Sequence, residues 1–443
     1  MKRFNELKVA KFGGSSLADA AQMKKCADII KAERSRRFVV PSAPGKRFKE
    51  DTKVTDLLIN CYNVSLAGGD TDAAFDAVAA RYNAIAEDLR VDIDLAPEYA
   101  LIRDALKKGT TIDYIASRGE YLNGRILADY IGYEFIDAAD LIFFHGDGRF
   151  DATLTNNRAS ALLAEKENAV IPGFYGSMPD GSIKTFSRGG SDITGAIISR
   201  AVMADIYENW TDVSGFMMCD PRIVQSPRPI KIITYRELRE LSYMGATVLH
   251  EESVFPVKLA GIPINIRNTN RPSDNGTLIV TSTEGYRTDD IITGIAGKKG
   301  FSVIRIEKDM MNGETGFAMR VLKVFSDLGL SFEHLPSGID TMCVVINTES
   351  IRGTEREILN SISRSVNPDN IELEGNLSLI AVVGRGMAGM PGTASRVFTA
   401  LSREGINVRM IDQGSSELNI IIGVHDDDFE YAIRCIYDEF NNG

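Results

Sequence analysis

The sequence predicts an α/β fold with a largely parallel sheet, followed by a smaller duplicated α/β region. Two observations support this prediction. Up to about residue 285, short apolar segments alternate with amphipathic segments of helical period, as in folds that layer helices on a sheet. Beyond that point the chain repeats its pattern with a shift of 76 residues. Such self-similarity indicates two copies of one structural unit that pack on each other.

The first region is expected to open on a strand, because apolar residues alternate with Lys8 and Lys11 over Leu7–Phe12. The further expected strands are Phe38–Val40, Glu134–Asp137, Ala169–Ile171, Ala204–Trp210, Ile264–Arg267 and Thr277–Val280. The expected helices include Ala20–Glu33, Val54–Leu66, Thr111–Tyr130, Asn156–Glu165 and Asp192–Ala201. Residues 46–53 are strongly charged and follow the sequence Pro-Ser-Ala-Pro-Gly, so we expect an exposed, mobile loop there.

In the second region, each copy is expected to run strand, helix, strand, strand, helix. The segment FSVIRI at 301–306 aligns with LSLIAV at 377–382, and Gly316 aligns with Gly392. The second copy stops after its last helix, whereas residues 291–297 form a spare strand before the first copy. We therefore expect the copies to share strands. The expected domains are residues 1–285, 286–375 and 376–443.

Length and composition limit the function classes. The 443 residues are enough for two or three domains, and 44% hydrophobic with 25% charged residues is ordinary for a soluble globular protein. No apolar run approaches the roughly 20 residues that span a bilayer, and the first residues lack a signal-peptide core, so we expect no membrane association. The net charge of −11 disfavours non-specific nucleic-acid binding.

The cysteines and histidines indicate a compartment and argue against a metal centre. The five cysteines are dispersed without a Cys-x-x-Cys pair, and none of the four histidines stands at ligand spacing from them. We therefore expect no structural zinc site. An odd number of scattered cysteines without a secretion signal is typical of reduced thiols, so we expect a cytoplasmic protein.

The first expected strand ends in a turn suited to phosphate. Lys11 opens the segment KFGGSS at 11–16, and a helical pattern follows near Asp19. Glycines let backbone amides approach a ligand closely, and a helix N-terminus favours negative charge. A lysine adds a mobile positive charge. A tight strand-to-helix turn with a surface lysine is the structural alternative, which a short glycine motif alone does not exclude.

Three further segments are richer in glycine and polar residues than a core requires. SRGEYLNGR at 117–125 lies in an expected helix, where Arg118 and Glu120 do not share a face, so that one of them could point toward a cleft. By themselves the two residues are interpreted as a solvated pair. SRGGSDITGA at 187–196 places a cation, two glycines and a carboxylate at a helix start, for which helix capping is the alternative. ENWTDVSGFMMCDPR at 208–222 contains the end of an expected strand at Trp210, and the residues after it suit a loop that holds a nucleotide base or ribose.

Together these segments predict a phosphoryl-transfer site. The histidines lie outside them, so no Ser-His-Asp order is visible, and Trp210 is expected to be a packed side chain. Neither the G-x-x-x-x-G-K-[ST] phosphate loop nor the His-Arg-Asp catalytic loop occurs, which excludes two large kinase classes.

Taken in order, the motifs resemble those of the aspartate kinases, members of the amino-acid kinase family with two C-terminal ACT units. KFGGSS, SRGE, SRGGSD, TDVSGFMMCDPR and YMGATVLH match in sequence order, and the resemblance covers essentially the whole chain. It implies an amino-acid kinase fold followed by two ferredoxin-like ACT units. It also implies phosphorylation of the β-carboxylate of L-aspartate by ATP with Mg²⁺, giving 4-phospho-L-aspartate, the first step toward lysine, threonine and methionine.

The resemblance then assigns roles to individual residues. Lys11 would neutralise charge on the transferred phosphoryl group, and Asp192 would orient Lys11. ATP would be bound by Lys11, Gly13, Gly14, Ser15, Thr211, Asp212 and Arg222. Aspartate would be bound by Ser42, Thr55, Glu120, Arg188, Gly189 and Ser191. Within that set, Arg188 would hold a carboxylate and Glu120 the ammonium. Met217 and Thr247 depart from the family pattern, where tyrosine and lysine are common, which affects contacts to the nucleotide base.

ACT units usually bind amino acids where two of them pair, so the resemblance implies feedback inhibition by lysine or threonine and a homodimer or homotetramer. The expected effector site lies in residues 308–317 and 330–340, where helix N-termini would take a carboxylate and Glu333 or Asp340 an ammonium. The effector residues would be Met311, Gly316, Phe317, Glu333, Ser337, Gly338 and Asp340. The second copy has similar turns and either binds ligand or only pairs.

Two other functions stay open at the level of sequence. Another amino-acid kinase, acting on glutamate or acetylglutamate, is disfavoured by the SRGE motif and the paired ACT units. A non-catalytic amino-acid sensor is disfavoured by the intact Lys11, Arg188 and Asp192. A fused homoserine dehydrogenase is not expected in a chain of this length.

Overall fold

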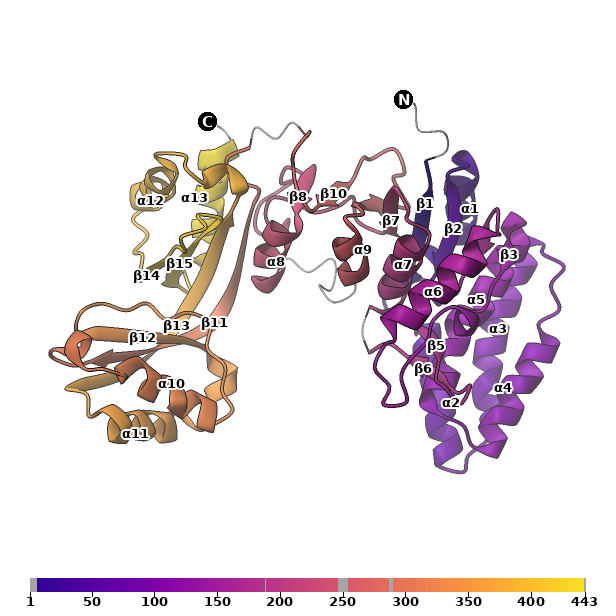
Figure 1. Ribbon diagram of the computed structural model, residues 1–443, viewed down its shortest axis with the longest axis horizontal. Coiled ribbons are helices and arrows are strands. Elements are labelled where there is room, and N and C mark those ends of the chain that lie inside the picture. The colour runs from indigo at the N-terminus through magenta and orange to yellow at the C-terminus, as the bar shows by residue number, and fades with distance from the viewer. Residues whose placement is uncertain (1–5, 188, 246–253, 287–289, 442–443) are drawn as a thin grey trace. The chain divides into compact units, whose positions relative to one another are not determined.

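The computed structural model describes residues 6–187, 189–245, 254–286 and 290–441 (Figure 1). The chain forms two compact units. The first comprises Met1–Phe216, Pro229–Tyr235 and Val248–Tyr286, and the second comprises Met217–Arg228, Arg236–Thr247 and Arg287–Gly443. Among the described residues, no helix combines the length and the apolar character needed to cross a membrane.

The first unit is built on an eight-stranded sheet in the order β3-β4-β2-β1-β7-β9-β10-β8. Its strands are β1 (Lys8–Phe12), β2 (Arg36–Pro41), β3 (Glu134–Phe135), β4 (Ala169–Val170), β7 (Ile206–Thr211), β8 (Ile232–Thr234), β9 (Ile264–Asn268) and β10 (Thr277–Val280). Neighbouring strands are parallel from β3 through β9, and β10 runs antiparallel to β9. Strand β1 therefore lies between β2 and β7, and their carboxyl ends meet at one edge of the sheet.

Helices cover both faces of this sheet. They are α1 (Ala20–Ala32), α2 (Val54–Leu66), α3 (Thr71–Leu89), α4 (Ala96–Lys108), α5 (Ile112–Ile131), α6 (Ala152–Ala164), α7 (Gly190–Ala201) and α9 (Phe255–Ala260). Helices α1 and α5 pack together on one face, with α2, α3 and α4 around them (Figure 1). Helix α7 packs on β1, β2 and β7 from the other face, next to α6 and α9. The predicted α/β class with a mainly parallel sheet agrees with this arrangement.

Capping residues explain where some elements differ from expectation. Helix α6 begins four residues earlier than expected because Asp151 caps it, accepting a hydrogen bond from the Leu154 amide. The expected strand at 134–137 is reduced to β3 because Asp137 instead caps a short 3-10 helix, Ala138–Asp140. The hairpin of β5 (Tyr175–Ser177) and β6 (Ile183–Thr185) was not anticipated.

The charged segment 46–53 is exposed, as predicted, but one side chain in it is anchored. Asp51 accepts hydrogen bonds from the Arg47 side chain and from Arg81, whose guanidinium is buried. Arg81 also donates to the carbonyl oxygens of Ala18 and Gly45. Through Arg81, the loop is therefore connected to the segment after β1 and to the segment after β2.

The second unit holds a five-stranded antiparallel sheet in the order β12-β11-β13-β15-β14. Its strands are β11 (Gly294–Glu307), β12 (Thr341–Asn347), β13 (Asn370–Val383), β14 (Met410–Asp412) and β15 (Asn419–His425). Its helices are α10 (Phe317–Asp327), α11 (Glu355–Val366), α12 (Thr393–Arg403) and α13 (Phe429–Asn441). Helices α10 and α11 cover the first copy and α12 and α13 the second.

The two longest strands run through both copies. Residues 301–307 of β11 pair with 370–377 of β13 in the first copy, and residues 294–298 pair with 379–383 in the second. The second copy, whose chain ends after α13, thus receives a strand segment that precedes the first copy. In place of the middle strand expected in the first copy, the structure has only two isolated bridges, His334 with Val345 and Ser337 with Met342.

Helix α8 (Tyr235–Tyr243) joins the second unit from Arg236 onward. Its Glu237 is fully buried and accepts hydrogen bonds from Thr293 and from the backbone amide and guanidinium of Arg385. Glu240 accepts one from Asn419. These bonds attach α8 to the start of β11 and to the second ACT-like copy.

Candidate active site

Lys11 lies at the carboxyl end of β1 with its ammonium group in a buried polar triad. Its Nζ is 2.6 Å from Asp192 Oδ1 and donates to Asn209 Oδ1 at 3.3 Å. Asn209 in turn donates through Nδ2 to Asp192 Oδ1 at 2.7 Å. Lys11 is only 7% exposed. The structure therefore brings together Lys11 and Asp192, which the sequence singled out, with Asn209, which it did not.

The glycine turn after Lys11 is shaped by two close backbone contacts. The Gly13 amide donates to the Trp210 carbonyl at 2.9 Å, and Gly14 accepts from the Gly45 amide at 2.8 Å. A Cβ atom on Gly45 would lie 2.7 Å from the Gly14 carbonyl carbon, closer than real side chains come. The prediction that Gly13 supplies a phosphate donor is corrected, because its amide is already bonded. Gly14 and Ser15 follow at the start of the short 3-10 helix Gly14–Leu17.

The start of α7 is built by close packing rather than by side-chain capping. The N-cap is Gly189, with φ at +58°, and no side chain caps the helix, so the capping interpretation of Ser191 and Asp192 is wrong. A Cβ on Gly190 would meet the Phe174 ring at 2.4 Å, and one on Gly195 would meet the Tyr207 hydroxyl at the same distance. These contacts seat the first turn against the sheet, where Asp192 reaches Lys11. Arg188 lies outside the described residues.

Arg118 and Glu120 on α5 are both buried, so the solvated-pair interpretation is wrong. Arg118 stacks on three tyrosine rings, those of Tyr114, Tyr121 and Tyr175. Burial raises the pKa of Glu120 to about 8, and a backbone hydrogen bond from Ala43 partly offsets this rise. Among the described residues, the Glu120 Oε2 atom has no hydrogen-bond partner. An unpaired buried carboxyl oxygen of this kind fits a cationic ligand.

The segments that carry Ser42 and Thr55 converge on the part of α5 that carries Glu120. The Ser42 amide donates to the Phe12 carbonyl, and its own carbonyl accepts from Asn123 on α5. A Cβ on Gly119 would be 2.9 Å from the Ala43 side chain and 3.9 Å from Thr55 Oγ1. A glycine in mid-helix thus lets α5 approach both α2 and the loop after β2. Local helix rules could not reveal this contact.

The loop after β7 supplies the remaining predicted nucleotide contacts. Thr211 ends β7 and its hydroxyl donates to Asp212, whose side chain is exposed. Arg222 belongs to the second unit, where it pairs with Asp220 at 2.6 Å and is 88% exposed. Met217 also belongs to that unit, and Thr247 lies outside the described residues.

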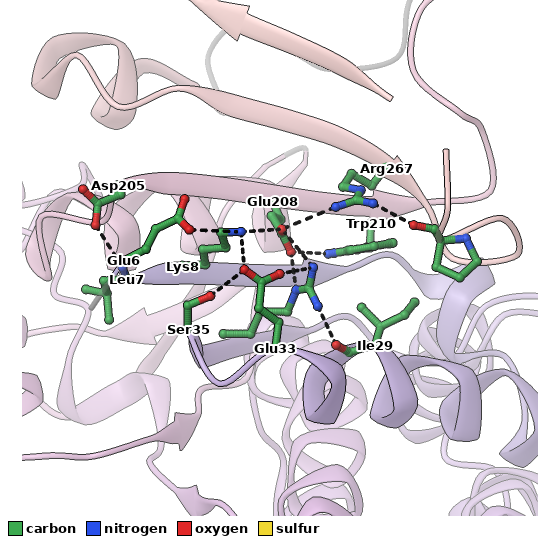
Figure 2. Close-up of polar contacts among 12 residues, drawn as sticks. Glu6, Leu7, Lys8, Ile29, Glu33, Ser35, Asp205, Glu208, Trp210 and Arg267 are labelled. Carbon is green, nitrogen blue, oxygen red and sulfur yellow. Dashed lines mark hydrogen bonds and ion pairs between the residues drawn. The ribbon is translucent and has the colours of Figure 1, made fainter. Parts of the chain in front are cut away.

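A buried ion network around Glu208 holds β7 (Figure 2). Because neighbouring residues of a strand point to opposite faces, this network lies on the face away from Asn209. Glu208 is 1% exposed and accepts from Arg36 Nε at 2.7 Å and from the Trp210 indole at 2.9 Å. The guanidinium of Arg267 lies over the Trp210 ring, 4.6 Å from its centre. Trp210 is packed, as predicted, but it also links a carboxylate to a cation.

In the second unit, the two segments predicted to bind an effector lie against each other. The Lys308 amide donates to the Asp340 carbonyl, and the Asn312 amide donates to the Ile339 carbonyl. Ser337, Gly338 and Asp340 are exposed, and Gly316 caps α10 with φ at +80°.

Three of the predicted effector residues use their side chains for contacts within the protein. Met311 and Phe317 pack into the apolar core under the first copy's sheet, so only their main chain is free to face an effector, and their place in that site stays a prediction. Glu333 accepts a hydrogen bond from the Tyr243 hydroxyl of α8. His334, next to it, contacts Asp412 of the second copy through Nδ1 at 2.7 Å.

Comparison with known proteins places this geometry in a family. The model of the amino acid kinase family matches residues 6–268, which is more than half of the chain, and an ACT domain model matches residues 380–440. The chain belongs to the amino acid kinase family.

Similar proteins within the amino acid kinase family indicate which reaction the chain catalyses. The chain is 39% identical over 452 residues to aspartokinase 3 of Bacillus subtilis, covering 99% of each. Its fold matches the crystal structure of aspartate kinase from Clostridium acetobutylicum with a TM-score of 0.91 and 51% identity, covering 98% of this chain and 100% of that one. E. coli aspartokinase III in complex with aspartate and ADP matches with a TM-score of 0.70 and 25% identity, covering 98% and 99%. The predicted amino-acid kinase fold with a C-terminal ACT region is confirmed, and so is the predicted enzyme class, aspartate kinase.

Proposed function

We propose that Lys11, Asp192 and the turn at 13–16 are the phosphoryl-transfer centre of this aspartate kinase. The observation that carries the proposal is the Lys11–Asp192 pair, 2.6 Å apart, which joins the carboxyl end of β1 to the first turn of α7. Ligands of open α/β sheets bind at this edge. A fixed ammonium group there meets the charge that spreads over the transferred group.

On the nucleotide side, the Gly14 and Ser15 amides would hold phosphate oxygens, and Thr211 with Asp212 would contact the rest of ATP. Mg²⁺ at such sites is held mainly by phosphate oxygens with one or two carboxylates, and it supplies charge neutralisation. The exposed carboxylate of Asp212 at the end of β7 could serve as such a ligand. Arg222 stays a predicted contact.

On the acceptor side, Glu120 would bind the ammonium of L-aspartate, with Ser42, Thr55, Gly189 and Ser191 around the substrate. Arg188 stays a predicted carboxylate clamp. An oxygen of the β-carboxylate attacks the γ-phosphorus of ATP, the bond to the bridging oxygen breaks, and ADP leaves with that electron pair. No proton need move, because the attacking carboxylate is ionised at neutral pH.

Replacing Lys11 tests the centre. For Lys11→Ala we expect kcat for aspartate-dependent ADP release to fall about 100- to 1,000-fold, because a fixed positive charge on the transferred group is lost. Lys8→Ala is the matched control, since Lys8 lies on the same strand but pairs with Glu33. A Lys11→Ala enzyme with kcat within a few-fold of the wild type would overturn the assignment. Activity with glutamate instead of aspartate would overturn the acceptor.

We further propose that the enzyme catalyses the first step toward lysine, threonine and methionine and is inhibited by lysine or threonine at 308–317 and 330–340. The similar C. acetobutylicum enzyme is an allosteric one. The exposed side chains of Met310 and Ile339 on these segments support a homodimer or homotetramer formed through ACT pairing. The cytoplasmic location, with five free thiols, stays a prediction.

Adding lysine, threonine or both to the ADP-release assay tests the feedback. We expect inhibition by at least one, and its loss in Asp340→Ala, because an exposed carboxylate is the available partner for an effector ammonium. The same samples, measured by light scattering, report the oligomer. Full activity at millimolar concentrations of both amino acids would contradict the regulatory proposal.

A further inference from the structure

We propose that Asn209 is a positioning residue for phosphoryl transfer, which holds the Lys11 ammonium and the Asp192 carboxylate through the two ends of its amide. The inference rests on the proposed function of the Lys11 turn and assigns a role to a residue outside the motifs that carry the family resemblance.

Strand register places Asn209 beside Lys11. The two residues are direct partners in the parallel β1–β7 pair, so their side chains share the face covered by α7. Asn209 is 2% exposed. Its neighbour Glu208 points to the opposite face, into the buried ion network. An amide in this position is therefore not a surface residue of the strand.

The chemistry of the side chain fits the two groups that it contacts. The carbonyl oxygen accepts from Lys11 at 3.3 Å, and the amide nitrogen donates to Asp192 at 2.7 Å. An ionised aspartate could only accept, a lysine could only donate, and a leucine could do neither. Because the amide is neutral, it orients the ammonium without cancelling the charge that would face the phosphoryl group.

The surroundings hold Asn209 rigidly. The Arg36–Glu208–Trp210 network fixes the strand on one side of it (Figure 2). On the other, the Tyr207 hydroxyl donates to the Asp192 main-chain carbonyl at 3.1 Å. Misplacement of a reacting group by about 1 Å can cost on the order of 100-fold in rate. A side chain that fixes Lys11 within this frame therefore acts on turnover more than on substrate affinity.

The first test is Asn209→Leu, which keeps the volume and removes both bonds. We expect kcat to fall about 10- to 100-fold while KM for ATP and for aspartate stays within about threefold. Asn265→Leu is the matched control, because Asn265 is the register partner of Glu208 on β9 and so faces away from Lys11. It should keep the wild-type kcat. Thermal unfolding of both variants shows whether they are folded.

The second test, Asn209→Asp, has a signature that a purely structural role would lack. A protonated carboxyl can accept from Lys11 and donate to Asp192 as the amide does, whereas the ionised form repels Asp192. The described charged groups bonded to this position are Lys11 and Asp192, and burial raises the pKa of nearby Tyr207 well above 10, so it stays neutral. We expect kcat relative to the wild type to rise severalfold from pH 8 to pH 6.

The outcomes separate the two proposals. Reduced kcat at constant KM, with recovery of Asn209→Asp at low pH, supports the positioning role. A folded Asn209→Leu enzyme with wild-type kcat overturns it and leaves the proposed function standing. If Asn209→Leu does not fold, a pH-independent Asn209→Asp enzyme overturns it. A wild-type enzyme without aspartate-dependent ADP release overturns the proposed function and, with it, this role.

Discussion

The carboxyl of Glu120 is buried on α5, and burial raises its pKa to about 8 from an ordinary value of 4.5. Between these two pH values the folded protein holds a proton that the unfolded chain has lost. The stabilisation from keeping this carboxyl neutral is therefore complete below pH 4.5 and is lost as the pH rises through 8. A substrate ammonium group bound beside Glu120 would lower the pKa of its carboxyl again, because a positive charge favours the ionised form.

This coupling predicts how aspartate binding depends on pH. Below pH 8 the free enzyme must release the Glu120 proton to pair with the substrate ammonium, so KM for aspartate should fall severalfold between pH 6 and pH 8. Glu120→Gln should bind aspartate more weakly and lose this dependence. Initial-rate measurements across the range check it, with KM for ATP as the internal control. A KM for aspartate that is flat in the wild type would contradict the role given to Glu120.

Single residues also show what the sequence could and could not reveal. Lys11 and Asp192 were predictable because each stands beside glycines at a strand or helix end, where such residues indicate ligand binding. Asn209 was not, since one polar residue in a buried strand has no local signature. Arg118 and Glu120 were misread because helix spacing says nothing about which helices pack on α5. Their burial depends on contacts between distant segments.

At the scale of elements, the turn after β1 and the loop after β2 are held together backbone to backbone. The Gly45 amide donates to the Gly14 carbonyl, and a Cβ on Gly45 would clash with the backbone of Gly14, while one on Gly14 would lie 3.0 Å from the Ala43 carbonyl oxygen. This contact sets where the Gly14 and Ser15 amides point. The strands were predictable from alternating and continuous apolar residues in the sequence. The contact between the two loops was not, because it joins distant segments and leaves no local sequence pattern.

Gly45→Ala tests this contact. The new Cβ would lie 2.7 Å from the Gly14 carbonyl and 2.9 Å from the Ser15 nitrogen, so backbone must shift. We expect KM for ATP to rise and kcat to fall, each about tenfold, with little change in KM for aspartate. Gly146→Ala is the control, because a Cβ there meets nothing within 4 Å. Equal kinetics for the two variants would show that the contact does not shape the nucleotide site.

At the scale of the whole molecule, neither unit is a continuous stretch of chain. Residues 236–245 lie within the sequence matched by the amino acid kinase model, yet α8 packs from Arg236 onward in the unit that contains both ACT-like copies. The 76-residue repeat and the missing last strand of its second copy were readable from the sequence. The attachment of α8 was not, because it rests on Glu237, whose partners stand 56 and 148 residues further along the chain.

The buried Glu237–Arg385 pair predicts a specific loss of stability in the second unit. Glu237→Ala leaves the partly buried Arg385 guanidinium without its carboxylate, which costs about 3 kcal/mol, the lower end for a buried pair, because the guanidinium keeps some contact with water. Calorimetric unfolding should show a lowered transition. Glu240→Ala, which removes one bond to Asn419 from the same helix, should cost only about 1 kcal/mol. Adding Arg385→Met to Glu237→Ala should restore much of the loss, because the unpaired charge is gone. If the double variant is no more stable than Glu237→Ala, the helix is held by its apolar contacts and not by the ion pair.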